Sequence, residues 1–80
     1  MKIFGYNKSN NSPIELIEPF ELAEITVNAS PFELRKIADF LNFTANNMEA
    51  KGDRFDHEHL ADNYDCFSDS PHFVVFKSHE

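Results

Sequence analysis

The chain has 80 residues, of which 41% are hydrophobic, so its length suits one domain (residues 1–80) with one small core and excludes a second core. Fourteen acidic residues against seven basic ones give a formal charge of −7, which repels phosphate backbones and excludes nucleic acid as the expected partner. A single cysteine, no apolar run long enough for a membrane and no signal-peptide pattern at the start together predict a cytoplasmic protein.

The N-terminal part of the chain is expected to form strands. Residues 2–6 are β-prone, and the polar residues 7–13 predict a loop, with a short helical turn at Pro13 as the alternative. Between residues 14 and 29 the apolar positions alternate but change parity once. This slip predicts a β-bulge or two short strands near Ala23 and Glu24, and Pro19 indicates an edge or a break.

One long helix is predicted over residues 31–51. Ser30 suits the N-cap, Pro31 the first helical position, and Glu33 completes a capping box, while Gly52 suits the left-handed C-terminal position. At 3.6 residues per turn, one narrow stripe of side chains is expected to pack on the sheet: Leu34, Ile37, Ala38, Leu41, Ala45 and Met48.

Aromatic residues are also predicted on the other side of this helix. Phe32 and Phe43 nearly eclipse each other there, with Phe40 on the flank. Either a loop folds over these rings, or Phe32 and Phe43 form a surface for self-association or for a partner.

The C-terminal part is predicted to contain a short second helix and a last strand. Leu60, Tyr64 and Phe67 fall at helical spacing, and residues 68–71 then break the helix. The run 73–76 predicts a strand buried on both faces, central in its sheet. The expected fold is therefore α+β: a mainly antiparallel sheet of three to four strands, covered on one face by the long helix, with a short helical turn before the last strand.

Acidic residues concentrate between residues 53 and 69, where Arg54 is the single base. This stretch is either a solvated face or a surface that steers a basic partner. The residues expected to bind a partner are Asp53, Asp56, Glu58, Asp62 and Asp65, together with Phe32 and Phe43.

The histidines are the first place to look for chemistry, because His57 and His59 lie beside Asp56, Asp62 and Cys66. On a helix, side chains two residues apart diverge by about 200°, so we expect no metal site there, whereas extended structure would allow one. The flanking acids weaken Cys66 as a nucleophile. Two separated glycines build no phosphate loop, and no serine stands in a nucleophile-elbow sequence, so we expect no catalytic residues and no cofactor.

Several segments resemble one known family, the small bacterial immunity proteins of polymorphic toxin systems of the type called immunity protein 32. The resemblance is carried by residues 2–6, 30–41, 48–49, 52–53 and 56–60, the last reading Asp-His-Glu-His-Leu. It implies a cytoplasmic protein that binds and neutralises a cognate toxin, and it implies no catalytic residue. An acidic inhibitor suits a basic nuclease toxin. Two alternatives stay open: a small metal-binding or enzymatic domain centred on His57 and His59, and a homodimerisation module that uses Phe32 and Phe43.

Overall fold

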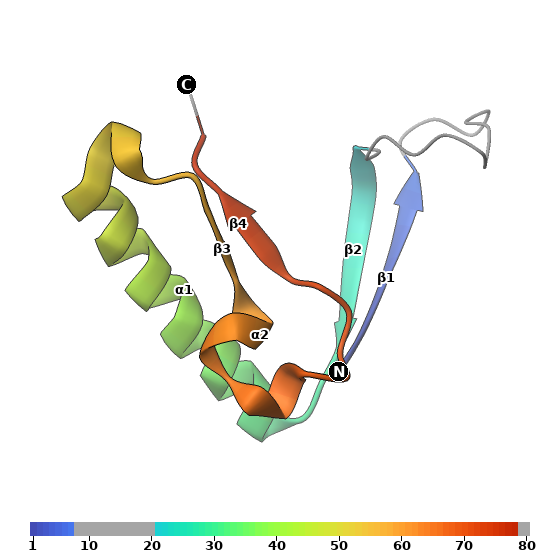
Figure 1. The fold of residues 1–80 in the computed structure, drawn as a ribbon. Coiled ribbons are helices and arrows are strands. Elements are labelled where there is room, and N and C mark those ends of the chain that lie inside the picture. Colours follow the sequence, from blue (N-terminus) through green and yellow to red (C-terminus); the bar gives the residue numbers. More distant parts are fainter. Residues whose placement is uncertain (8–20, 79–80) are drawn as a thin grey trace.

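The computed structural model describes residues 1–7 and 21–78, and it shows an α+β protein (Figure 1). The predicted single sheet of three to four strands is wrong, because the strands form two separate antiparallel pairs, β1–β2 and β3–β4. The predictions for residues 8–20, namely the loop, the turn at Pro13 and the effect of Pro19, lie outside the described residues. In chain order the elements are β1 (Lys2–Asn7), β2 (Leu22–Asn28), α1 (Pro31–Lys51), η1 (Gly52–Arg54), β3 (His57–His59), α2 (Leu60–Asn63), η2 (Asp65–Phe67) and β4 (Val74–Phe76).

Helix α1 begins and ends where its capping residues predict. The Ser30 hydroxyl accepts a hydrogen bond from the Glu33 amide at 3.2 Å, and the Ser30 amide donates to the Glu33 carboxylate at 2.9 Å. These two bonds complete the capping box, so both groups satisfy amides that the helix leaves without a partner. At the other end Gly52 has a φ of 54°, a conformation that side chains with a Cβ rarely adopt.

The buried face of α1 differs from the predicted stripe. Phe40 is fully buried, whereas Leu34 and Leu41 are 50% and 43% exposed. The buried face centres on Ile37, Phe40 and Thr44, which is a rotation of roughly 80° around the helix axis. The helix carries apolar side chains on more than one side, and the elements packed against it decide which side is buried. Burying Phe40 removes a large ring from water, and that ring meets Phe73 edge-on at 6.2 Å.

The predicted short helix is confirmed as α2 followed by η2. Leu60 and Phe67 are almost completely buried and form the core with Ile37 and Phe40, and Tyr64 packs against that core. The three- and four-residue spacing of Leu60, Tyr64 and Phe67 places these side chains on one side of the α2–η2 segment. This segment covers the N-terminal half of α1 (Figure 1).

The ribbon β3–β4 lies between α1 and the hairpin β1–β2 (Figure 1). Its register pairs His57 with Phe76 and His59 with Val74. The prediction of a last strand buried on both faces and central in its sheet is wrong: among the described strands β4 pairs with β3 alone, and Phe76 is 65% exposed. Only one face of β4 packs against the buried core of the described residues, because Val75 contacts that core and side chains alternate along a strand.

The hairpin β1–β2 contains the predicted bulge. Tyr6 pairs with Glu24, but Asn7 pairs with Leu22, so the register skips Ala23. The extra residue resolves the change of parity in the apolar pattern of this segment, because a bulge lets apolar residues before and after it lie on the same face. None of the helices in residues 1–7 and 21–78 is long and apolar enough to span a membrane.

Candidate partner-binding surface

One face of the hairpin β1–β2 carries apolar side chains that the rest of the described molecule leaves largely uncovered. We call it the inner face, and it consists of Ile3, Leu22, Ile25 and Val27. Ile25 is 56% exposed and Leu22 is 45% exposed. Leu22 lies over Gly5, where an added Cβ would come within 2.7 Å of the leucine side chain. The glycine therefore allows Leu22 to lie flat on this face.

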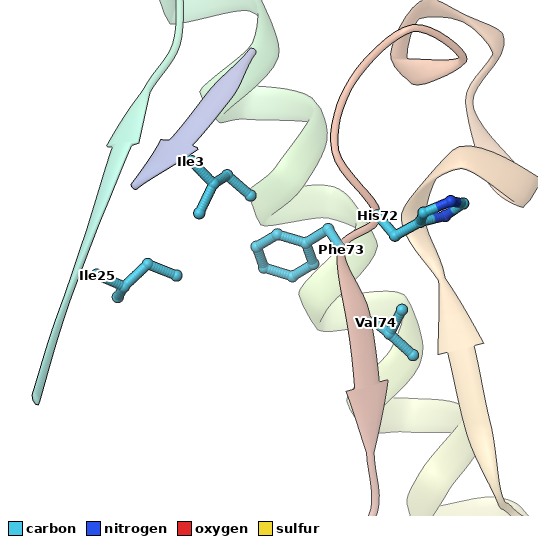
Figure 2. Close-up of a pocket in the computed structure, with 5 residues that line it drawn as sticks. All are labelled: Ile3, Ile25, His72, Phe73 and Val74. Carbon is cyan, nitrogen blue, oxygen red and sulfur yellow. The ribbon is translucent and has the colours of Figure 1, made fainter. Parts of the chain in front are cut away.

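The inner face forms one wall of a pocket of about 230 Å³ (Figure 2). Ile3 and Ile25 line the pocket from the hairpin, and His72, Phe73 and Val74 line it from the segment that enters β4. Figure 2 shows the ring of Phe73 pointing toward the two isoleucines across the pocket. The pocket is thus an apolar groove between the two strand pairs, with a histidine at its edge.

The outer face of the hairpin is also exposed. Phe4 and Tyr6 lie there, 56% and 67% exposed, together with Glu24 and Thr26. A two-stranded sheet with no covering layer is marginally stable in water, because it needs a packed face to offset the entropy of ordering its strands. A hairpin exposed on both faces is therefore suited to packing against the surface of another molecule.

The acidic residues predicted to bind a partner do not form one patch. Asp53 and Asp56 follow the C-terminal end of α1, whereas Asp62 and Asp65 belong to the α2–η2 segment beside its N-terminal half (Figure 1). Asp53 pairs weakly with Lys77 at 3.7 Å. Glu58 accepts a hydrogen bond from Asn63 at 3.1 Å, which occupies it within the fold. Asp62 and Asp65 are exposed and are the better placed for a partner.

Phe32 and Phe43 are exposed on α1, at 56% and 48%. The ammonium of Lys36 lies 5.6 Å from the centre of the Phe32 ring and 5.7 Å from that of Tyr64, a cation–π arrangement that ties Phe32 to the molecule's own surface. Phe43 has no such neighbour among the described aromatic contacts. Leu34 and Leu41 are also exposed, but on the opposite side of this helix from Phe32 and Phe43.

The segment of His57 and His59 is a strand, so the extended alternative applies, the one in which the two side chains can share an ion. Side chains two residues apart lie on the same face of a strand, and the two rings have centroids 5.0 Å apart. The segment His57–His59 pairs with Val74–Phe76 as an antiparallel strand, and the helical spacing begins only at Leu60. In the part of the chain that the structure describes, no three His, Cys, Asp or Glu side chains are arranged to hold one metal ion.

The remaining polar features serve the fold. The α-ammonium of Met1 lies 2.8 Å from the Glu33 carboxylate and donates to the Ser70 hydroxyl at 3.3 Å. The hydrogen bond from this ammonium lowers the pKa of Glu33, and the Ser30 amide adds to the effect. Cys66 is exposed.

Two parts of this surface, the inner face and His72, were not predicted from the sequence. The alternation of Ile25 and Val27 predicted a strand, but it did not predict which face of that strand would be left uncovered. No pattern local to residues 70–73 indicated that His72 lies beside the groove. No known family, curated protein or solved structure matches this chain.

Proposed function

We propose that this chain is a stoichiometric protein-binding inhibitor, and that its partner docks on the inner face of the hairpin and in the adjoining groove. In line with the resemblance to immunity proteins, the proposed partner is a cognate bacterial toxin, which the chain neutralises in the cytoplasm without catalysing a reaction. The observation that carries the proposal is the apolar groove between Ile3, Ile25 and Phe73, which the molecule's own described residues leave open.

Burial supplies the driving force in this proposal. Apolar surface removed from water contributes about 25 cal/mol per Å², and the inner face and groove together offer a contiguous apolar area. A partner that covers Ile25 and Val27 also stabilises the hairpin itself, because it adds the packed layer that a two-stranded sheet needs. Binding is then expected to stabilise the hairpin.

Charge sets the class of partner. The formal charge of −7 and the exposed Asp62 and Asp65 favour a basic protein, such as a nuclease, and disfavour nucleic acid and an anionic membrane surface. Charged residues at the rim of an interface mainly raise the association rate. The double substitution Asp62→Asn and Asp65→Asn is therefore expected to slow association, and to reduce its dependence on salt, while dissociation changes less.

The test uses the C-terminal domain of a toxin-like protein encoded beside the gene for this chain. Growth of bacteria that express this domain is measured with and without the chain, and binding is measured on the purified proteins. Ile25→Asp is expected to abolish both protection and binding, because it places a carboxylate in the groove. Thr26→Asp is the matched control, since it adds the same charge one residue away on the outer face.

Protection by the wild-type chain that Ile25→Asp removes and Thr26→Asp preserves would support the proposal. Equal loss in both variants would place the partner elsewhere, and unchanged binding in Ile25→Asp would overturn the groove as the docking site. Absence of protection by the wild-type chain, with the neighbouring domain shown to be toxic, would overturn the inhibitor function.

A homodimer through α1 is the second candidate, because Phe32 and Phe43 are both about half exposed. Light scattering of the purified chain distinguishes the two. A dimer that Phe43→Ser converts to a monomer would favour this candidate, while a monomer at all concentrations would exclude it.

A further inference from the structure

We propose that His57 and His59 form a two-histidine chelate for a divalent transition-metal ion, with water completing the coordination. The site lies on the face of the ribbon β3–β4 that is turned away from α1, because Val75 packs against the core that includes Ile37 and Phe40 of α1. The two histidines lie on the other face of the ribbon, with Val74 and Phe76. It does not depend on the proposed inhibitor function.

The spacing of the rings fits one shared ion. Two imidazoles bound to a tetrahedral ion at about 2.0–2.1 Å have ring centres about 5 Å apart. The ring centroids of His57 and His59 are 5.0 Å apart, with the ring planes at 73°. The separation of the two rings is therefore compatible with one shared ion.

The orientation of His57 is fixed by its neighbours. The Asp56 carboxylate lies 2.6 Å from Nδ1 of His57, which leaves Nε2 as the free donor. A carboxylate on the second ring nitrogen is the arrangement that orients metal-bound histidines and raises their basicity. The Phe76 ring stacks on the other side, with centroids 5.0 Å apart and planes at 24°, so the imidazole has little freedom to swing.

The number of protein ligands follows from the other side chains nearby. The His72 ring lies 6.1 Å from that of His59, about 1 Å beyond the separation that a shared ion requires. Glu58 lies on the opposite face and accepts a hydrogen bond from Asn63. The described residues contain no convergent group of three ligands, which agrees with a site of two histidines and leaves the other positions for water.

The two imidazole ligands determine which metal ions are expected to bind. Imidazole nitrogen suits Cu²⁺, Ni²⁺ and Zn²⁺, and affinity for such sites rises from Mn²⁺ through Ni²⁺ to Cu²⁺. Mg²⁺ and Ca²⁺ prefer oxygen ligands and are expected not to bind here.

Calorimetric titration of the whole chain with Ni²⁺ and Zn²⁺ tests the site, with Mg²⁺ as the negative control. The expected result is one ion per chain, with at least tenfold weaker binding in His57→Ala and in His59→Ala. Asp56→Asn is expected to weaken binding by about tenfold, the lower end of the effect of such supporting carboxylates. His72→Ala is the matched control, and its affinity is expected to stay within twofold of the wild type.

Circular dichroism shows whether each variant is folded, so a loss of metal binding in a folded variant can be attributed to the substituted side chain. Wild-type affinity in folded His57→Ala or His59→Ala would overturn the site. An equal loss in His72→Ala would overturn the two-histidine assignment, and unchanged affinity in Asp56→Asn would overturn the role of the carboxylate. Binding of Mg²⁺ with similar affinity would show adventitious cation binding only.

Discussion

The ribbon β3–β4 and the hairpin β1–β2 are both antiparallel strand pairs, yet they have opposite relations to the core. The strands of the ribbon are three residues long, and those of the hairpin are six and seven. The shorter pair is half-buried, because Phe73 and Val75 pack against the core of α1, whereas the longer pair exposes apolar side chains on both faces. Strand length therefore says little about how firmly a strand pair is held, and the layer packed against it says more.

The difference also separates the buried core from the proposed partner-binding surface. The fully buried side chains Phe40, Leu60 and Phe67 all belong to α1 and to the α2–η2 segment. The hairpin contributes none of the buried core among the described residues. We therefore expect substitutions in the helical part to change the free energy of unfolding, and substitutions in the hairpin to change binding.

The largest effect is expected at Phe40. Its ring is completely buried, so Phe40→Ala leaves a cavity and is expected to cost about 3–5 kcal/mol, which is much of the stability of so small a domain. Ile25→Ala in the hairpin is expected to cost about 0.5 kcal/mol, since Ile25 is 56% exposed. Denaturant unfolding of both variants measures the contrast.

Leu41→Ala is the control on α1 itself, because Leu41 neighbours Phe40 in sequence but is 43% exposed. Its cost is expected to fall well below that of Phe40→Ala. A destabilisation by Ile25→Ala or Leu41→Ala equal to that by Phe40→Ala would contradict the division between a buried helical part and an open hairpin.

A smaller effect, of opposite sign, is expected at Thr44. Its side-chain oxygen is buried on the core face of α1 and has no hydrogen-bond partner among residues 1–7 and 21–78. A buried hydroxyl in that state costs about 1–3 kcal/mol, so Thr44→Val is expected to stabilise the fold by about 1 kcal/mol or more. Thr26→Val on the exposed hairpin is the comparison and is expected to change the unfolding midpoint little. A loss of stability in Thr44→Val would mean that the hydroxyl is bonded in solution.

The smallest expected effect is a dependence of the free energy of unfolding on pH in the acid range. The Met1 ammonium holds the pKa of Glu33 below its ordinary value of 4.5, so the ionised carboxylate stabilises the folded state. This contribution is complete above pH 4.5 and is lost as pH falls through the lower pKa of the folded state. Glu33→Gln is expected to be less stable than the wild type at pH 7, and the gap is expected to narrow in acid. A gap that stays constant from pH 7 to pH 3 would refute this linkage.

Local patterns predicted the elements of this chain better than their packing. Ser30, Glu33 and Gly52 define both ends of α1 through contacts within a few residues, and the parity change at Ala23 reflects the geometry of one strand pair. These signals are local, and the structure confirms them. The proposed partner-binding residues stay predictions, although the structure shows which of them are exposed.

The packing could not be predicted in the same way, because it depends on distant residues. The helix has apolar side chains around much of its circumference, and the contact of Phe40 with Phe73 selects the buried side. Similarly, His57 and His59 adopt a strand because Val74 and Phe76 lie opposite them, far along the chain. The helical spacing from Leu60 onward was correct, but it did not decide between helix and strand for the two histidines before it.

The open hairpin is also expected to affect the solubility of the chain when no proposed partner covers it. In the described part of the molecule, the outer edges of β1 and β2 present unpaired backbone groups over six to seven residues, next to apolar faces. Such an edge templates the addition of another strand, whereas the three-residue β4 is too short to do so effectively. The open hairpin is thus expected to be a nucleus for aggregation, and its exposed strand edges limit how concentrated the free chain can become before it associates.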